Sequence, residues 1–255
     1  MSTILDRILA TKAGELVQRK AQRSQADLES ALANASMTDP RGFVAALRRQ
    51  AEQKQPGVIA EIKKASPSAG IISEDFDPVT KAKEYELFGA SALSILTEED
   101  YFLGSIKYLK DVKAISNLPI LRKDFVIDEY QIYESKLIGA DCILLIVSIL
   151  SDSELQRFSS LADTLGLDYI IEVHDEAELK RVEDFSDAII GVNNRDLKTF
   201  EVNIENSIRL RNFFKEENIF VAESGIKNQK DIDKLSKHNI NVFLIGESLM
   251  RGDFL

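Results

Sequence analysis

Short apolar runs recur along this chain every 20 to 30 residues or so, and each is followed by a stretch with helical periodicity. Such alternation is typical of repeated strand–helix units, which build a parallel sheet. We count eight units and predict strands at residues 58–63, 92–96, 119–123, 142–147, 169–173, 188–192, 219–222 and 242–245. Because a (β/α)8 barrel typically takes about 250 residues, these 255 residues predict an α/β fold, a (β/α)8 TIM barrel.

Helix start and stop signals agree with this segmentation. Asp77 and Pro78 look like an N-cap followed by a proline in the first helical turn, and the helix should end near Gly89. Ser151 and Glu154 have the spacing of a capping box, in which each side chain binds a backbone N–H at the helix start. The predicted helices are therefore bounded where the strands require.

Residues 1–57 precede the first predicted strand and have helical spacing of their own. The apolar positions of the first part are Ile4, Leu5, Ile8, Leu9, Leu16 and Val17, and a further helix should start at Asp39-Pro40 with Phe43, Val44 and Leu47 inward. Their apolar face is too small to form a separate core. We therefore predict one domain, residues 1–255, with residues 1–57 as an N-terminal helical extension packed on the barrel.

Composition and charge limit the classes of partner. The chain is 44% hydrophobic and 29% charged, an ordinary globular balance, and its net charge of -10 argues against nucleic-acid or anionic-membrane binding. Asp6 and Arg7 interrupt the N-terminal apolar residues, so they do not resemble a signal peptide, and no later run reaches the length of a membrane span. We expect a cytoplasmic protein with no nucleic-acid or membrane partner, a monomer or a weak homodimer.

Cysteine and histidine usage argues against disulfides and metal sites. Cys142 is the single cysteine and lies in an apolar run, which favours a buried core thiol in a reducing compartment. His174 and His238 are the two histidines, far apart in the sequence, and the chain has no CxxC or HExxH motif. We therefore expect no metal site.

Charged and amide side chains stand where several predicted strands end, at the edge of a barrel that carries the active site. They are Glu61, Lys63, Lys123, Glu172, Asn193, Arg195 and Glu223. Glu61 and Lys63 are two residues apart, so both point to the same side of their strand. A lone charge at a strand end is usually solvated, but opposite charges can compensate one another around a central cavity. The set therefore predicts an active site built from lysines and glutamates.

Two glycine-containing segments follow the last two predicted strands. Ser224-Gly225-Ile226 and Gly246-Glu247-Ser248 occupy the loops that commonly bind phosphate in this fold, where backbone N–H groups and a helix start can hold an anion. Each glycine alone is equally well explained by a turn, and the carboxylate of Glu247 must point away from a phosphate. We predict a small phosphorylated substrate.

A polar loop and a group of apolar residues are expected at the same rim. Residues 66–70 follow the first strand and are either a loop that closes over a ligand, with Ser66 as a hydroxyl donor, or simply a flexible turn. Apolar residues near this rim are Pro67, Leu96, Phe102, Phe125, Leu144 and Leu197. They form either a pocket for an aromatic ring or ordinary core contacts.

Five segments together resemble the indole-3-glycerol-phosphate synthase family: residues 61–68, 120–125, 171–174, 191–197 and 222–226. The resemblance implies closure of the pyrrole ring of 1-(2-carboxyphenylamino)-1-deoxyribulose 5-phosphate, with loss of carbon dioxide and water, to give indole-3-glycerol phosphate in tryptophan biosynthesis. It implies a carboxy-lyase that uses no cofactor. The chain ends at Leu255, where the family usually continues its final helix, so that helix is short or trimmed.

The same resemblance implies roles for the candidate residues. Lys123 would protonate the ribulose carbonyl, Glu172 would be the base in the loss of water, and Lys63 would hold the substrate carboxylate and share in proton transfer. Glu61, Asn193 and Glu223 would orient the lysines and bind substrate hydroxyls, and Arg195 would fix neighbouring acidic groups. Ser66, Gly225, Gly246 and the backbone of Glu247 would surround the phosphate, with Ser224 nearer the ribulose.

Two other functions fit the residues. In a phosphate-binding aldolase, Lys123 would form a Schiff base with a sugar ketone, which borohydride would trap. In a non-catalytic barrel, the cavity would bind a phosphorylated metabolite as a sensor or scaffold, which any substrate turnover would exclude.

Overall fold

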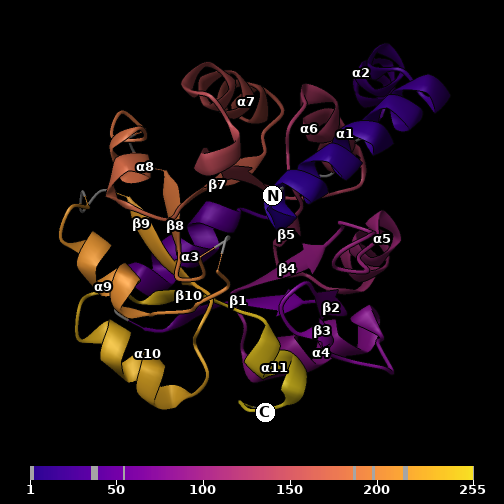
Figure 1. The fold of residues 1–255 in the computed structure, drawn as a ribbon. Coiled ribbons are helices and arrows are strands. Elements are labelled where there is room, and N and C mark those ends of the chain that lie inside the picture. Colours follow the sequence, from indigo (N-terminus) through magenta and orange to yellow (C-terminus); the bar gives the residue numbers. More distant parts are fainter. Residues whose placement is uncertain are drawn as a thin grey trace.

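The computed structural model describes residues 3–35, 40–53, 55–185, 188–196, 199–214 and 218–254. Within these ranges eight parallel strands close into a barrel, each paired with its neighbours in sequence (Figure 1). They are β1 (Gly57–Ile62), β4 (Ala92–Leu96), β5 (Ile120–Lys123), β6 (Cys142–Ile146), β7 (Asp168–Val173), β8 (Ile189–Asn193), β9 (Ile219–Glu223) and β10 (Val242–Ile245). The predicted (β/α)8 barrel is confirmed, and each predicted strand agrees with the structure to within one residue at either end.

Helices surround the barrel in the alternating order that the sequence predicts (Figure 1). They are α4 (Pro78–Phe88), α5 (Ile106–Ile115), α6 (Glu129–Leu137), α7 (Asp152–Thr164), α8 (Glu176–Lys180), α9 (Glu205–Arg211), α10 (Gln229–Ser236) and α11 (Glu247–Arg251). Asp77 caps α4, and Ser151 with Glu154 forms the predicted capping box of α7. The last helix, α11, is short, with five residues.

Alternate residues of the strands belong to two separate hydrophobic clusters. Ile59, Leu121 and Ile170 belong to a cluster inside the barrel, which also contains Cys142. Neighbouring strand residues such as Ala60 belong to the larger cluster between the barrel and its helices. Cys142 is fully buried, and burial raises the pKa of its thiol well above the ordinary value, as expected for a core thiol.

Helix α3 (Phe43–Glu52) closes the end of the barrel where the strands begin. Phe43 and Leu47 are fully buried in the interior cluster. The prediction that this helix starts at Asp39-Pro40 is wrong: Asp39 lies outside the described residues, and the helix begins at Phe43, after Gly42 in a left-handed conformation. The backbone N–H of Val44 donates to Asp168, the first residue of β7 (3.0 Å). Because α3 covers this end of the barrel, a site can open only at the opposite end.

The N-terminal helices α1 (Ile4–Gln22) and α2 (Gln25–Asn34) lie at that opposite end (Figure 1). The N-terminal end of α1 lies near the centre of the barrel opening, and α2 packs against α6 at the outside. The buried face of α1 passes through Ile8, Lys12 and Leu16. The expected apolar stripe is therefore partly wrong, because Val17 is 70% exposed and a lysine occupies a buried position.

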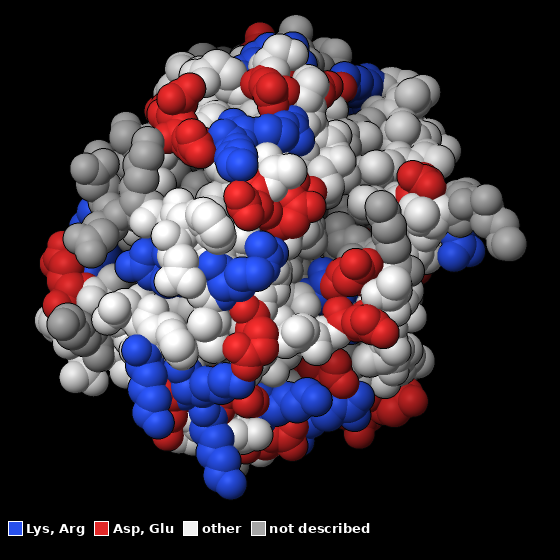
Figure 2. Space-filling model, turned by 60° about the vertical axis from the view of Figure 1, so that its left-hand side comes forward, with Lys and Arg blue, Asp and Glu red and all other residues white. Residues whose placement is uncertain are grey.

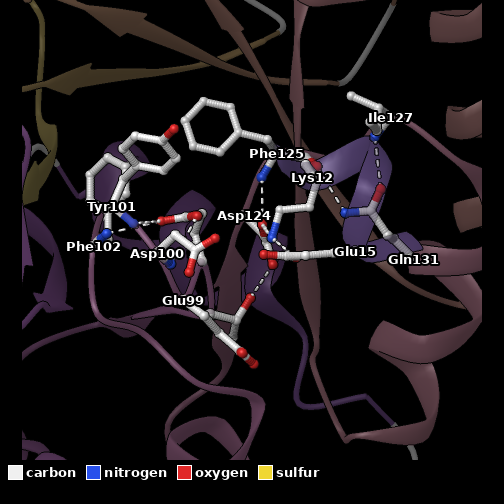
Figure 3. Close-up of polar contacts among 12 residues, drawn as sticks. Lys12, Glu15, Glu99, Asp100, Tyr101, Phe102, Asp124, Phe125, Ile127 and Gln131 are labelled. Atoms are coloured by element: carbon white, nitrogen blue, oxygen red, sulfur yellow. Dashed lines mark hydrogen bonds and ion pairs between the residues drawn. The ribbon is translucent and has the colours of Figure 1, made fainter. Parts of the chain in front are cut away.

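Lys12 is buried because two carboxylates compensate its charge (Figure 3). Its Nζ lies 2.7 Å from Oε2 of Glu15 and 3.2 Å from Oδ1 of Asp124, which directly follows strand β5. Burial alone would lower the pKa of Lys12, but the charges of Asp124 and Glu15 outweigh it and the pKa is raised. This ion pair joins the N-terminal extension to the barrel rim.

We expect Lys12→Met to lower the free energy of unfolding by about 2 kcal/mol, because Asp124 loses a buried partner but keeps Arg122 and Thr97. The matched control is Lys20→Met in the same helix. Its ion pair with Asp128 is about one-third exposed, and its loss should change stability by no more than about 0.5 kcal/mol. Urea unfolding of both variants measures the difference, and equal values would contradict a structural role for Lys12.

The surface is mixed in charge on the face that Figure 2 shows, where basic and acidic side chains lie interspersed. Basic side chains gather near the lower edge of this view, with acidic ones between them. Across the described residues, the helices lack the combined length and hydropathy that crossing a membrane requires.

Candidate active site

A cavity of about 470 Å³ opens at the carboxyl end of the barrel. Every barrel strand or the residue next to it contributes to its wall. The alternation that places Ile59, Leu121 and Ile170 inside the barrel also places Glu61, Lys123 and Glu172 inside, nearer the opening. The polar residues of the cavity therefore continue the interior rows of the core.

Lys123 lies between two carboxylates. Its Nζ donates to Oε2 of Glu172 at 2.8 Å and to Oε2 of Glu223 at 2.9 Å. Burial alone would lower the pKa of Lys123, but the charges of Glu172, Glu223 and Glu61 raise it well above its ordinary value. Lys123 is therefore an ammonium group at neutral pH.

The two carboxylates that share Lys123 differ in their surroundings. Oε1 of Glu172 accepts a hydrogen bond from Nδ2 of Asn193 at 3.1 Å, whereas Oε1 of Glu223 is buried without a hydrogen-bond partner in the described chain. Burial raises the pKa of Glu172, but Lys123, His174 and Asn193 outweigh it and lower the pKa to about 2. Burial and the charge of Glu172 raise the pKa of Glu223 to about 7. Glu172 is thus the carboxylate that stays ionised.

Glu61 and Lys63 form a second pair on the cavity wall, with Nζ of Lys63 2.5 Å from Oε1 of Glu61. The prediction that both point to the same side of their strand is confirmed, and that side faces the cavity. Gly246 leaves room for this pair, because a Cβ at that position would lie 2.3 Å from Oε1 of Glu61. The absence of a side chain at Gly246 therefore has a steric reason besides the expected anion binding.

The segment after β9 turns back at the cavity wall. Ser224 and Gly225 both have positive φ, 64° and 82°, and Nδ2 of Asn194 donates to the Ser224 carbonyl at 3.2 Å. Such left-handed conformations are uncommon outside glycine and mark a constrained turn. Lys227 lines the cavity next to this turn and supplies a positive charge.

The carboxylate of Glu247 is turned toward Arg251, whose Nη2 lies 3.1 Å from Oε1. The charge of Glu247 is therefore compensated by a cation, so that it would repel a bound anion less. Arg251 also lines the cavity, so this side of the cavity has two cations, Lys227 and Arg251.

Part of the cavity wall is apolar. It includes Pro67, Leu96, Phe102, Phe125 and Leu144, all of which line the cavity as the sequence predicts. The rings of Phe102 and Phe125 have centroids 6.1 Å apart and are tilted by 43°. Ile4, Leu5 and Ile8 of α1 complete this wall. The cavity thus has both charged and apolar lining residues, which suits a ligand with an aromatic ring and an anionic group.

The segment after β1 is a small hairpin. Residues Ala65–Ser66 (β2) pair antiparallel with Gly70–Ile71 (β3), and Oγ of Ser66 accepts from the Ala69 N–H at 3.2 Å. Residues 67–69 are the turn of this hairpin, and the paired residues on either side hold its ends together. Ser66 lies at the cavity wall, as predicted.

Comparison with known proteins agrees with this geometry. The family model described as indole-3-glycerol phosphate synthase matches residues 5–254. The chain belongs to this family. Proteins named indole-3-glycerol phosphate synthase from two strains of Acidithiobacillus ferrooxidans are each 48% identical to it over 251 residues, covering 98% of this chain and 95% of theirs. The family resemblance inferred from the five sequence segments is confirmed.

A solved structure supports the fold alone. The crystal structure of tryptophan synthase subunit alpha from Legionella pneumophila has a TM-score of 0.59 to this member of the indole-3-glycerol phosphate synthase family. The match covers 84% of this chain and 88% of that one at 12% sequence identity. At this identity the likeness concerns the barrel.

The structure brings nearly all the candidate residues of this synthase-family member to one cavity. The lining contains Glu61, Lys63, Ser66, Pro67, Leu96, Phe102, Lys123, Phe125, Leu144, Glu172, Asn193, Arg195, Glu223, Ser224, Gly225, Gly246 and Glu247. Leu197 lies outside the described residues. Among the described residues, no group of three or more His, Cys, Asp or Glu side chains is arranged to hold a metal ion.

Arg195 has other partners than expected. Its Nη1 donates to the carbonyl of Phe200 at 3.5 Å, and within the described part of the chain it makes no ion pair with the acidic groups of the cavity. The expectation that Arg195 fixes neighbouring acidic groups is therefore wrong in this structure. The backbone of Arg195 pairs with that of Val202, and both residues line the cavity.

Several cavity residues were not predicted. Ile4, Leu5 and Ile8 read as an ordinary apolar helix stripe, which gives no sign that they cover a cavity. Lys227 and Arg251 are charged residues in helix-rich surroundings, where a solvated position is the usual one. The one available signal was the position of Lys227, two residues after the predicted phosphate-loop glycine.

We expect Gly191→Ala to reduce turnover about 10- to 100-fold while leaving the fold intact. A Cβ at Gly191 would lie 2.0 Å from Oε1 of Glu223, so the carboxylate must leave its place beside Lys123. The control is Gly14→Ala, where nothing lies within 4 Å of the added Cβ. Steady-state kinetics and thermal unfolding of both variants check this, and wild-type kcat in Gly191→Ala would contradict it.

Proposed function

We propose that this chain is an indole-3-glycerol-phosphate synthase. It closes the ring of 1-(2-carboxyphenylamino)-1-deoxyribulose 5-phosphate to give indole-3-glycerol phosphate, carbon dioxide and water, as a carboxy-lyase of tryptophan biosynthesis. The observation that carries the proposal is an ammonium group, Lys123, beside an ionised carboxylate, Glu172, in a cavity with one apolar wall. Family membership supports the reaction, and this geometry supports the residues assigned to it.

In the first step the aromatic carbon that bears the carboxylate attacks the ribulose ketone. The new C–C bond places negative charge on the ketone oxygen, and Lys123 donates a proton to it. An ammonium group held by two buried carboxylates is already oriented before the charge develops, which is the form of electrostatic stabilisation that accelerates such steps. We assign the general-acid role to Lys123 on this basis.

In the later steps the carboxylate leaves as carbon dioxide, which restores the aromatic ring, and the new hydroxyl takes a proton from Lys63 and leaves as water. Glu172 takes the proton released in the dehydration, because its low pKa keeps it unprotonated at neutral pH. Lys63 would hold the substrate carboxylate and share in proton transfer, with Glu61 beside it. Asn193 orients Glu172 and Glu223 orients Lys123.

We place the phosphate at the wall formed by the segments after β9 and β10. Backbone N–H groups of Gly225, Gly246 and Glu247, the hydroxyl of Ser66 and the side chain of Lys227 would bind it there. Ser224 and Arg195 would lie nearer the ribulose. The aromatic ring of the substrate would contact the apolar wall, where Phe102 and Phe125 lie.

The Schiff-base alternative is weakened by the charge on Lys123. A lysine attacks a ketone as a neutral amine, and the two carboxylates that raise the pKa of Lys123 oppose that form. Trapping of substrate carbon by borohydride would restore the aldolase hypothesis. We also propose that the protein acts as a monomer, in the cytoplasm.

The test is a fluorescence time course of the purified protein with 1-(2-carboxyphenylamino)-1-deoxyribulose 5-phosphate, without added metal or cofactor. The chain contains no tryptophan, so indole emission that grows with time comes from product. We expect such growth. Its absence with folded protein would refute the proposed activity and favour a binding role.

A further inference from the structure

His174 is the one histidine close to the proposed base, and it does not line the cavity. It follows β7, two residues after Glu172, and its ring lies between two carboxylates. Nε2 is 3.4 Å from Oε1 of Glu172, and Nδ1 is 3.1 Å from Oε2 of Glu178 in helix α8. The side chain is 15% exposed.

The backbone of His174 is held on both sides. Its N–H donates to Oε2 of Glu178 at 2.7 Å, and its carbonyl accepts from Nδ2 of Asn206 in α9 at 2.9 Å. The ring therefore cannot leave its place between Glu172 and Glu178 without breaking these contacts. Its position is a fixed part of the site.

A neutral ring does not suit this position. A neutral imidazole donates from one nitrogen and presents a lone pair on the other, so one carboxylate would face a lone pair. In the structure the buried Nε2 has no hydrogen-bond partner among the described residues, and Oε1 of Glu172 is its charged neighbour at 3.4 Å. An imidazolium presents no lone pair to either carboxylate, and both carboxylates attract its charge. The geometry therefore fits the charged form.

We propose that His174 is a positioning residue that acts through Glu172: as an imidazolium, it keeps the carboxylate of Glu172 ionised and oriented for proton transfer. This inference rests on the proposed function for the role of Glu172. The charge state of His174 itself can be measured without turnover.

The charges around Glu172 explain why a second cation is needed. Glu172 and Glu223 share the single ammonium of Lys123, so two buried carboxylates face one positive charge. The ring of His174 contacts Oε1 of Glu172, the oxygen that also accepts a hydrogen bond from Asn193. These contacts stabilise the ionised form of Glu172 relative to that of Glu223. A proton taken up by the two carboxylates therefore goes to Glu223, and the base stays free.

The charges that act on His174 come from several elements. Burial lowers the pKa of His174, but Glu178 of α8, Glu172 of β7 and the more distant Glu223 of β9 outweigh it, and the pKa is raised. Lys123 of β5 faces the other side of Glu172. This direction agrees with the geometry.

The first measurement is NMR of the full chain labelled with ¹⁵N-histidine. The chain has two histidines, and His238 is exposed, so it serves as an internal reference; His238→Gln assigns the signals. We expect the ring nitrogens of His174 to show the imidazolium signature at neutral pH. A neutral His174 ring at neutral pH would overturn the proposal.

The second measurement is the pH dependence of kcat/KM for His174→Gln, which keeps a donor beside Glu172 but removes the charge. Loss of a nearby cation raises a carboxylate pKa, so the acid limb should move up by about one pH unit, a loss that approaches tenfold at pH values below the limb and disappears above it. Glu178→Gln should move the limb in the same direction by less, and His238→Gln should not move it.

A loss of activity that is equal at every pH would show a merely structural role and would overturn the inference. An unshifted acid limb in His174→Gln would overturn it as well. Failure of the wild-type protein to form product is a different result, because it refutes the proposed function while the NMR titration still decides the charge of His174. The two hypotheses therefore fail separately.

Discussion

Lys123→Ala should lower kcat by about three orders of magnitude and change KM by less than about threefold. The ammonium group acts on charge that appears at the ketone oxygen during ring closure, so its removal affects the transition state more than substrate binding. The phosphate and the aromatic ring are bound by other walls of the cavity. Stopped-flow and steady-state fluorescence measure both parameters.

The control for this variant is Lys107→Ala, since the side chain of Lys107 is 76% exposed and pairs with Asp111 at the surface. It should keep wild-type kcat. Removing Lys123 also leaves Glu172 and Glu223 without their shared cation, which raises their pKa values and favours uptake of a proton. Circular dichroism would confirm that the barrel is intact, and near-wild-type kcat in a folded Lys123→Ala protein would remove Lys123 from the mechanism.

Glu172→Gln should uncouple the loss of carbon dioxide from the formation of indole. Glutamine keeps the size and the hydrogen-bonding oxygen of the side chain but cannot take up the proton released on dehydration. Ring closure and decarboxylation should still occur, and overall turnover should fall by about 10²- to 10⁴-fold. In a single turnover, we expect carbon dioxide release to precede indole emission by a long interval.

Glu176→Gln is the matched control, because Glu176 stands in α8 near the end of the same strand but pairs with Lys180 at the surface. Its two signals should rise together, as in the wild type. If they also rise together in Glu172→Gln at the wild-type rate, the dehydration uses another base. A simultaneous slowing of both signals would instead place Glu172 in the ring-closing step.

The parts of the site that lie on strands could be predicted from the sequence. In a strand at residues 58–63, alternation requires Glu61 and Lys63 to point to the same side. The structure places Nζ of Lys63 2.5 Å from Oε1 of Glu61. By the same alternation, Lys123 points inward because Leu121 does, and Glu172 points inward because Ile170 does. Strand geometry is local, so a local pattern is sufficient.

Contacts between distant segments could not be predicted in this way. Lys12 meets Asp124 only because α1 starts at the barrel opening and runs outward past α6, and no spacing in the first 57 residues reveals that direction. The unequal proton affinities of Glu172 and Glu223 depend on which of them lies beside Asn193 and His174. The partner of Arg195 could not be predicted for a related reason, because the turn that brings its side chain to the carbonyl of Phe200 forms only in the folded chain.

Core residues and cavity residues alternate with outward-facing residues in the same register along each strand. A change in strand length would therefore disturb the core and the active site together. In β5 the alternation that buries Leu121 also presents Lys123, and in β7 the alternation that buries Ile170 also presents Glu172. Inserting or deleting one residue in either strand would invert both at once. Evolution and protein engineers alike can therefore vary the loops of this barrel in length, but must reshape its strands by substitution.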